Sequence, residues 1–324
     1  MPLANEFSII ERYFKVKAQS SSRTDVIQSI GDDCAIVQPR SGYQLVFSMD
    51  TLIEGVHFPH NTSPANIATK ALAVNLSDLA AMGAEPAWFT LALSLPENNQ
   101  PWLEVFSSAL LEMANRYNIQ LIGGDTTRSP TLSITIQVHG YVKDRALLRS
   151  TAKVNDYIAV TGELGAAAMG LQLELYPEHN VKLSELHKEK ALAALHRPVP
   201  QIEMGMSLTH YSRCAIDISD GLYADLGHIL EQSQCAGILN LDKLPLAGCL
   251  QNLSKDEAYK IALTGGDDYQ LCFTLSEKAL EEIKKQDFEF SVIGCITNGR
   301  GLSLLENNRP YQLGNQKSGY DHFI

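Results

Sequence analysis

The residues of this chain whose types and spacing could do chemistry are aspartates beside glycine or serine, at the apparent ends of strands and helices. All of them are Asp rather than Glu, and hard divalent cations prefer oxygen ligands on short, rigid side chains. As a set they predict Mg²⁺ binding. The motifs are IGDDCA (Asp32, Asp33), FSMDTL (Asp50), NLSDLA (Asp78), GGDTTR (Asp125), IDISDGL (Asp217, Asp220) and TGGDDYQL (Asp267, Asp268).

Each motif taken alone also has an ordinary structural interpretation, since Gly-Asp is common turn chemistry and Asp is a common helix cap. Gathered together without metal, these carboxylates would repel one another. A pair at ~4 Å costs about 4 kcal/mol at an effective dielectric of 20. Bound cations would offset that repulsion and lower the carboxylate pKa values. Phosphoryl transfer is the chemistry that uses several Mg²⁺ ions in this way.

Asp78 lies on a helix stripe that should face the core, where a charged side chain is unfavourable. Segment 63–86 has a Ser-Pro start and a Gly-x-x-Pro stop, which predicts a helix over 65–82. A carboxylate facing the core there is costly, and the nearby helix C-terminus disfavours negative charge. Either the helix turns Asp78 to water, or Asp78 caps a neighbouring turn, or a cation holds it. The stripe that should face the core contains Ile67, Ala71, Val74, Asp78 and Ala81.

Phosphate groups could be bound by the backbone N–H groups of the Gly-rich turns. The sequence has no GxxxxGK[ST] loop and no HRD or DFG set, which disfavours the common nucleotide-binding folds. Arg128 and Arg149 could supply local positive charge, although a surface ion pair is the alternative for each.

Apolar patterning predicts two α/β domains joined near residue 150. The first has strands at 45–50, 88–95 and 132–142 with helices at 65–82 and 101–117, and GGDTT at 123–127 is expected to break the chain before the third strand. Because the order does not alternate strictly, mixed or antiparallel sheets are expected. The second domain is predicted to contain strands at 157–162, 214–219, 270–275 and 290–297, and helices from Gly165 and at 185–196, 200–210, 221–234, 255–263 and 277–286.

Bulk composition restricts the class of protein. The 324 residues are 45% hydrophobic and 19% charged, with a formal net charge of −11, which argues against nucleic-acid and anionic-membrane partners. No apolar run reaches transmembrane length, and the first residues lack the form of a signal peptide. The scattered cysteines contain no CxxC pair and predict reduced thiols in a cytoplasmic protein. They are Cys34, Cys214, Cys235, Cys249, Cys272 and Cys295.

Taken in order, the motifs IGDDCA, DTLIEGVHF, KALAVNLSDLAAMGAEPAW, LIGGDTTR, IDISDGL, GGDDYQLCF and GYDHF resemble those of the thiamine-monophosphate kinase family. The resemblance covers essentially the whole chain, and GGDT and DISDG are shared with the wider superfamily of aminoimidazole ribonucleotide synthetase and selenophosphate synthetase. It implies a two-domain α/β (α+β) fold. Residues 1–148 would form a mixed-sheet domain that binds ATP and metal and pairs across a homodimer as a β-barrel, and residues 149–324 a C-terminal α/β domain.

The implied reaction moves the γ-phosphoryl group of ATP directly to thiamine monophosphate, with several Mg²⁺ ions and no amino-acid nucleophile. The implied metal ligands are Asp33, Ser48, Met49, Asp50, Asp78, Asp125, Asp217 and Asp220. The implied ATP contacts are Gly124, Asp125, Arg149 and Ser219. The implied thiamine contacts are His57, Asp267 and Tyr320, for which a structural histidine and an exposed tail are the alternatives at positions 57 and 320.

Three departures from the family pattern stand out. Asp267 and Gln270 replace the usual Glu residues, so a direct contact of Asp267 with substrate could become water-mediated. Met49 replaces a small hydroxyl residue, so any ligand there must be its main-chain oxygen. Two other functions remain open: an ATP-dependent enzyme of the same superfamily acting on a purine-pathway or selenium substrate, and a nucleotide sensor without catalysis.

Overall fold

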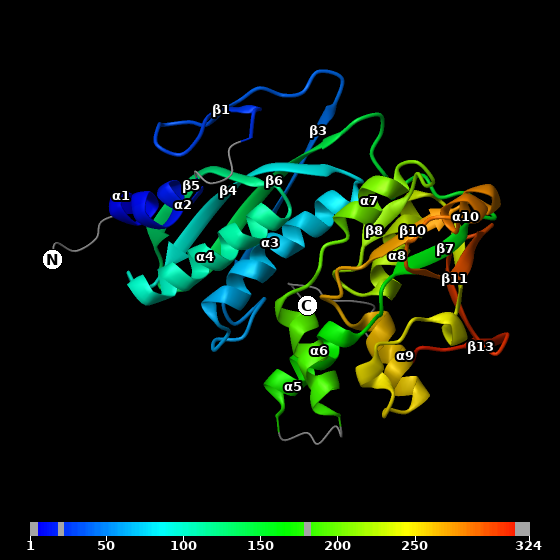
Figure 1. Ribbon diagram of the computed structural model, residues 1–324. Coiled ribbons are helices and arrows are strands. Elements are labelled where there is room, and N and C mark those ends of the chain that lie inside the picture. Colours follow the sequence, from blue (N-terminus) through cyan, green and yellow to red (C-terminus); the bar gives the residue numbers. More distant parts are fainter. Residues whose placement is uncertain (1–5, 19–22, 178–182, 315–324) are drawn as a thin grey trace. The chain divides into compact units, whose positions relative to one another are not determined.

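The computed structural model describes residues 6–18, 23–177 and 183–314 (Figure 1). Its contacts divide the chain into two compact units. The first unit comprises Met1–Leu79 with Ala84–Arg145, and the second comprises Ala80–Gly83 with Ala146–Ile324.

The first unit is built on a four-stranded mixed sheet in the order β3-β6-β4-β5, where β4 and β5 are parallel and the other pairs antiparallel. A separate antiparallel pair, β1 with β2, completes its strands. The strands are β1 (Val26–Gln28), β2 (Ile36–Val37), β3 (Gln44–Ile53), β4 (Glu85–Leu95), β5 (Gln120–Arg128) and β6 (Ser133–Val142). The helices are α1 (Glu6–Ile9), the π-helix η1 (Ile10–Lys15), α2 (Val16–Ala18), α3 (Pro64–Ala81) and α4 (Gln100–Arg116).

Alternation along the strands gives this sheet two different faces. The inner face is buried and carries Leu52, Ile134 and Ile136, with α3 and α4 over it (Figure 1). The outer face carries the alternate residues. The β1–β2 pair covers part of it, where Val26 and Val37 pack against Trp88, Ile122 and Tyr141.

Helix α3 confirms the predicted helix over 65–82. The hydroxyl of Ser63 accepts a hydrogen bond from the N–H of Asn66, and the chain reverses at Gly83, where φ is +70°. The helix is buried nearly all round, since every residue from Ala71 to Ser77 is buried. A core helix of this kind is positioned by its polar contacts as well as by an apolar stripe.

The expectation that GGDTT breaks the chain is wrong, because β5 runs through these residues as far as Arg128. The second glycine of the motif, Gly124, permits the strand to continue beside β4. A Cβ added at Gly124 would lie 1.8 Å from the carbonyl oxygen of Leu91, so only glycine allows this approach. A bulge between Phe89 and Thr90 in the β4–β5 pairing accompanies it.

The second unit is built on a seven-stranded sheet in the order β13-β12-β9-β11-β7-β10-β8, in which only β12 and β9 pair in parallel. Its strands are β7 (Tyr157–Thr161), β8 (Ala215–Asp217), β9 (Ala236–Asn240), β10 (Leu271–Leu275), β11 (Phe290–Thr297), β12 (Gly301–Glu306) and β13 (Arg309–Tyr311). Its helices are α5 (Ala166–Leu175), α6 (Glu185–His196), α7 (Ile202–Leu208), α8 (Leu222–Gln232), the 3₁₀ turns η2 (Leu241–Lys243) and η3 (Gly248–Leu250), α9 (Lys255–Thr264) and α10 (Glu277–Ile283).

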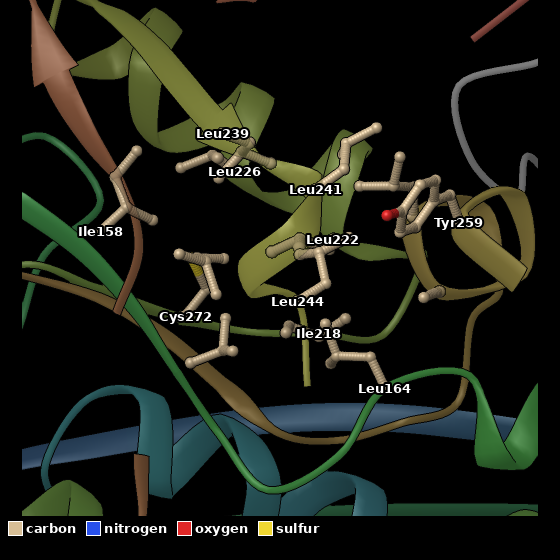
Figure 2. Packing of buried hydrophobic residues seen from close by; sticks show 14 of the residues in the cluster. Ile158, Leu164, Ile218, Leu222, Leu226, Leu239, Leu241, Leu244, Tyr259 and Cys272 are labelled. Carbon is tan, nitrogen blue, oxygen red and sulfur yellow. The ribbon is translucent and has the colours of Figure 1, made fainter. Parts of the chain in front are cut away.

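A hydrophobic core joins this sheet to its helices. Figure 2 shows Leu222 of α8 and Tyr259 of α9 in the same cluster as Ile158 of β7 and Leu239 of β9. Side-chain caps set the helix starts: Ser254 and Glu257 form a capping box on α9. The mixed sheets in both units confirm the predicted fold class.

Several elements were not predicted from the sequence. They are short, or they lack a clear apolar period. The unpredicted elements are α1, η1, α2, β1, β2, β5, β9, η2, η3, β12 and β13.

In the part of the chain that the structure describes, no helix combines the length and the apolar character needed to cross a membrane.

Candidate functional site

In the first unit, β3 and α3 bring three of the predicted metal ligands together. The hydroxyl of Ser48 donates a hydrogen bond of 2.5 Å to Oδ2 of Asp78. The backbone N–H of Asp50 donates to Oδ1 of Asn75 at 3.1 Å, and Nδ2 of Asn75 donates to the carbonyl of Ala71. Asn75 is fully buried, so it fixes the strand against the helix one turn before Asp78.

The electrostatics of this cluster are unfavourable without a cation. Burial, and after it the charge of Asp78, raises the pKa of Asp50 to about 6. Asp78 is half-buried, whereas its stripe neighbours Val74 and Ala81 are buried. The stripe therefore does face the interior as predicted, and Asp78 lies where it leaves the apolar core.

Met49 lies on the opposite face of β3 from Ser48 and Asp50. Its side chain is 60% exposed, and it pairs with Gln137 on the outer face of the sheet. The side chain thus points away from the cluster.

Gly124 and Asp125 lie on β5, at the other edge of the sheet from β3. The register runs from Asp50 through Ile136 and Leu91 to Gly124, which is three strand spacings or about 14 Å. Asp125 is exposed, and its register places it on the outer face. Within this unit, the structure therefore does not bring Asp125 together with Asp50 and Asp78.

Asp33 and His57 lie on connecting segments of the same unit. Asp33 is exposed between β1 and β2, and its N–H is bound by Oδ1 of Asp32 at 2.9 Å. Nδ1 of His57 accepts the N–H of Ile53 at 3.0 Å. A neutral His57 therefore carries its proton on Nε2, which makes Nε2 the donor of the ring.

In the second unit, the end of β8 carries Asp217, and the turn from β8 to α8 carries Ser219 and Asp220. Asp217 is buried at the end of β8, and Ser219 and Asp220 are half-buried. Oδ2 of Asp225 accepts the N–H groups of residues 219, 220 and 221, each at 3.1 Å. The carboxylate of Asp225 therefore holds the turn in its observed shape.

The surroundings of Asp225 disfavour its charged form. Burial and the charge of Asp220 raise its pKa to about 7, against the lowering effect of the three N–H donors. A negative charge at this helix start is favoured by the helix dipole. Its role is to order the turn that carries the predicted ligands.

Asp267 lies on the loop between α9 and β10, and this loop is bound to the β8–α8 turn. The N–H of Asp267 donates to the carbonyl of Ser219 at 2.9 Å. Its neighbour Asp268 is buried, and Oδ2 of Asp268 accepts the N–H of Gly165 at 2.7 Å at the start of α5. The structure therefore places Asp267 beside the segment that carries Ser219 and Asp220.

The remaining predicted residues are Arg149 and Tyr320. Arg149 has an exposed side chain, and its carbonyl accepts a hydrogen bond from Ser233 at 2.8 Å. Tyr320 lies outside the described residues.

The sequence analysis missed Asn75 and Asp225, which hold predicted ligands, and it named Asp268 only among the possible Mg²⁺-binding aspartates. Each had a weak signal that could have identified it. Asn75 is a polar residue within a buried helical run, Asp225 falls in the first turn after a glycine, and Asp268 was attributed to the same motif as Asp267. None of these patterns reveals the distant backbone N–H groups or the strand that the side chain binds.

The predicted metal ligands are divided between the units, with Asp217 and Asp220 in the second and the others in the first. Among residues 6–18, 23–177 and 183–314, no group of three or more His, Cys, Asp or Glu side chains is arranged to hold a metal ion. The donors present are nevertheless carboxylate and hydroxyl oxygens, which suit Mg²⁺. The raised pKa of Asp50 shows that a cation would relieve an existing repulsion.

Comparison with known proteins decides the family. Residues 31–142 match the family "AIR synthase related protein, N-terminal domain". The chain is also 46% identical over 327 residues to the thiamine-monophosphate kinase of Salmonella typhimurium, with 98% of each chain covered. The chain belongs to the thiamine-monophosphate kinase family.

Solved structures agree with this membership. The crystal structure of thiamine-monophosphate kinase from Stenotrophomonas maltophilia K279a is similar, with a TM-score of 0.82, 42% identity, and coverage of 94% of this chain and 96% of that one. A structure described as "AaThiL complexed with AMPPCP and TMP" has a TM-score of 0.76 and 28% identity, with coverage of 100% and 99%. The thiamine-monophosphate kinase fold thus extends over both units.

We expect Asp50→Asn to stabilise the metal-free protein, and to do so more strongly as the pH rises. The folded-state pKa of Asp50, about 6, lies above its ordinary value of 3.8, so the wild type loses stability as pH increases from about 4 to about 6. The variant has no such titration and should gain about 1–3 kcal/mol above pH 6. Urea unfolding in the presence of a chelator at several pH values measures this difference.

Asp32→Asn is the matched control, because Asp32 is an exposed aspartate in the same unit. It should leave the pH dependence of unfolding unchanged. Equal pH dependence for wild type and Asp50→Asn would contradict the electrostatic interpretation of the cluster.

Proposed function

We propose that this protein transfers the γ-phosphoryl group of ATP to the phosphate of thiamine monophosphate, giving thiamine diphosphate and ADP. The observation that carries the proposal is 46% identity over 98% of the chain to a thiamine-monophosphate kinase. The similarity to the complex with AMPPCP, an ATP analogue, and TMP supports both substrates. The transfer is direct and in line, and it uses no nucleophilic side chain.

Gly124, Asp125, Arg149 and Ser219 are the proposed nucleotide contacts. The N–H of Ser219 is bound by Asp225, and its carbonyl accepts from Asp267. The proposed contact of Ser219 therefore uses its hydroxyl group. Gly124 is exposed, and Arg149 supplies a charged donor for phosphate oxygens.

The cofactor of the proposed reaction is Mg²⁺, as several ions. The carboxylates of Asp33, Asp50, Asp78, Asp125, Asp217 and Asp220 would hold them, together with oxygens of Ser48 and Met49. The repulsion between Asp50 and Asp78 supports this assignment. When bound, such ions neutralise charge on the phosphates and on the transferred phosphoryl group. Ser48 and Asn75 hold Asp78 and the strand of Asp50 in place for this role.

His57, Asp267 and Tyr320 are the proposed contacts to the thiamine group. Thiamine carries a thiazolium cation and a flat aminopyrimidine, for which a carboxylate and an aromatic face are suitable partners. The Nε2 donor of His57 suits an acceptor on the aminopyrimidine ring. Tyr320 lies outside the described residues and is assigned from motif resemblance alone.

The protein is further proposed to be a homodimer in which the two four-stranded sheets join as a β-barrel. Phe47 and Met49 are 66% and 60% exposed on the outer face of β3, which is an edge strand. Apolar side chains and unpaired strand edges exposed in this way are suited to association with a second copy. Residues 1–148 thus form the proposed ATP-binding, metal-binding and dimerisation domain, and residues 149–324 the C-terminal domain. The division between the two compact units near residue 145 supports this proposal.

A cytoplasmic location is proposed because the co-substrate is ATP. The cysteines in the described residues are free thiols, which also favours a reducing compartment.

Purified protein with ATP, Mg²⁺ and thiamine monophosphate should release ADP and form thiamine diphosphate. A coupled ADP assay with product analysis measures both. ADP formation that needs a different acceptor, such as a purine-pathway intermediate, would indicate another enzyme of the superfamily. ATP binding without turnover on any acceptor would indicate a nucleotide sensor.

Two substitutions at His57 test the roles of its two ring nitrogens separately. His57→Gln keeps a donor near the position of Nε2 and should retain the KM for thiamine monophosphate within about threefold. His57→Asn keeps an acceptor for the N–H of Ile53 but removes the outer donor, so this KM should rise about tenfold. Steady-state kinetics give both values, and equal effects of the two variants would assign His57 a purely structural role.

Phe47→Asp should convert the proposed dimer into a monomer, since it places a charge in the middle of the exposed apolar strand. Analytical ultracentrifugation measures the change in mass. Phe7→Asp is the matched control, because Phe7 is 76% exposed on α1 and not on β3. A Phe47→Asp protein with the wild-type mass would contradict dimerisation through this face.

A further inference from the structure

The loop that links α9 to β10, residues 265–270, has an unusual backbone. Asp267 and Tyr269 both have positive φ values, +69° and +48°, although neither is glycine. A left-handed conformation costs such residues about 1 kcal/mol or more, and it is especially uncommon for a bulky side chain. Strain at two positions separated by one residue persists only where the surrounding structure imposes it.

Backbone hydrogen bonds to the end of β8 impose this conformation. The N–H of Asp267 donates to the carbonyl of Ser219 at 2.9 Å, and the N–H of Tyr269 donates to that of Ile218 at 2.8 Å. A Cβ added at Gly266 would lie 2.5 Å from the carbonyl oxygen of Ser219, so the loop must approach this turn closely. The loop is therefore held against the turn that carries Ser219 and Asp220.

Asp268, between the two strained residues, anchors the loop on its other side. Its carboxylate is buried and accepts the N–H groups of Gly165 and Ala167 at 2.7 and 3.5 Å. The Asp268 side chain is directed to the start of α5. The side chains of Asp267 and Tyr269, its neighbours in the sequence, contact each other. The hydroxyl of Tyr269 donates to Oδ1 of Asp267 at 3.1 Å.

We propose that Tyr269 is a positioning residue for substrate recognition, whose hydroxyl orients the Asp267 carboxylate toward the cationic thiamine group. This inference rests on the proposed function. Asp267 has the shorter of the two acidic side chains and hence a short reach, so its direction matters more than it would for Glu. A hydrogen bond from a phenol to a carboxylate is charge-assisted and directional, and it restricts the rotation of the carboxylate. The strained backbone of Tyr269 is what places the phenol within reach of Asp267.

Tyr269→Phe tests the proposal, because it removes the hydroxyl and keeps the ring. We expect the KM for thiamine monophosphate to rise about tenfold, the loss typical of a hydrogen bond to a charged group. The kcat at saturating substrate should stay within about twofold, and the KM for ATP should not change. Calorimetric titration with thiamine monophosphate should show the same loss of affinity.

Tyr311→Phe is the matched control in the same unit. The hydroxyl of Tyr311 donates to Oδ1 of Asp256 at 2.9 Å, so the variant removes an equivalent Tyr–Asp hydrogen bond elsewhere. It should leave all kinetic constants at wild-type values. A double-mutant cycle of Tyr269→Phe with Asp267→Asn should be non-additive, because Tyr269 acts through Asp267.

Three results would overturn the inference while leaving the proposed function intact, provided that the wild type phosphorylates thiamine monophosphate. They are an unchanged KM in Tyr269→Phe, an equal loss for ATP and thiamine monophosphate, and full additivity with Asp267→Asn. A wild type without this activity would instead overturn the proposed function, and the inference with it.

Discussion

The structure depends on which groups offset the negative charge of its buried carboxylates. A carboxylate removed from water requires hydrogen-bond donors or a positive charge, and the aspartates of this chain differ in which of the two they have. Asp225 and Asp268 each accept backbone N–H groups at the start of a helix. Asp25 is bound by the guanidinium of Arg23 through two hydrogen bonds. Asp225 and Asp268 thereby order the backbone around them.

Asp50 and Asp78 lie in a different environment from these three aspartates. For Asp50, burial and the charge of Asp78 act in the same direction and raise its pKa. Their positions are set by neutral groups, namely the hydroxyl of Ser48 and the amide of Asn75. A pair of acids held by a hydroxyl group and an amide suits a cation that comes with the substrate. This distinction separates the carboxylates that build the fold from those suited to phosphate chemistry.

Close approach of backbone segments is the second constraint, and glycine meets it at two points. Gly124 lets β5 lie against Leu91, and Gly266 lets the loop before β10 lie against Ser219. At each point the residue that follows is one of the proposed site residues, Asp125 or Asp267. Both aspartates are therefore carried on backbone that hydrogen-bonded neighbours restrain, and not on long loops.

The sequence by itself determined the family, the fold class and most helices and strands. The aspartate motifs are local and ordered along the chain, and apolar runs with start and stop signals mark elements such as α3 and α9. It also indicated that Met49 could act only through its main chain, and alternation along β3 places the Met49 side chain on the outer face. It did not predict that GGDTT continues as β5, because that depends on a partner strand distant in the sequence.

Only the tertiary structure decided which aspartates are partnered and by what. The roles of Asn75, Asp225 and Asp268 arise from contacts with strands, turns and helix starts that lie elsewhere in the sequence. The Tyr269–Asp267 hydrogen bond joins close neighbours, yet it exists because distant carbonyl groups hold both residues in a left-handed conformation. Residue type and spacing identify groups that can do chemistry. Their orientation is set by hydrogen bonds that form only when the chain has folded, and local sequence does not encode these.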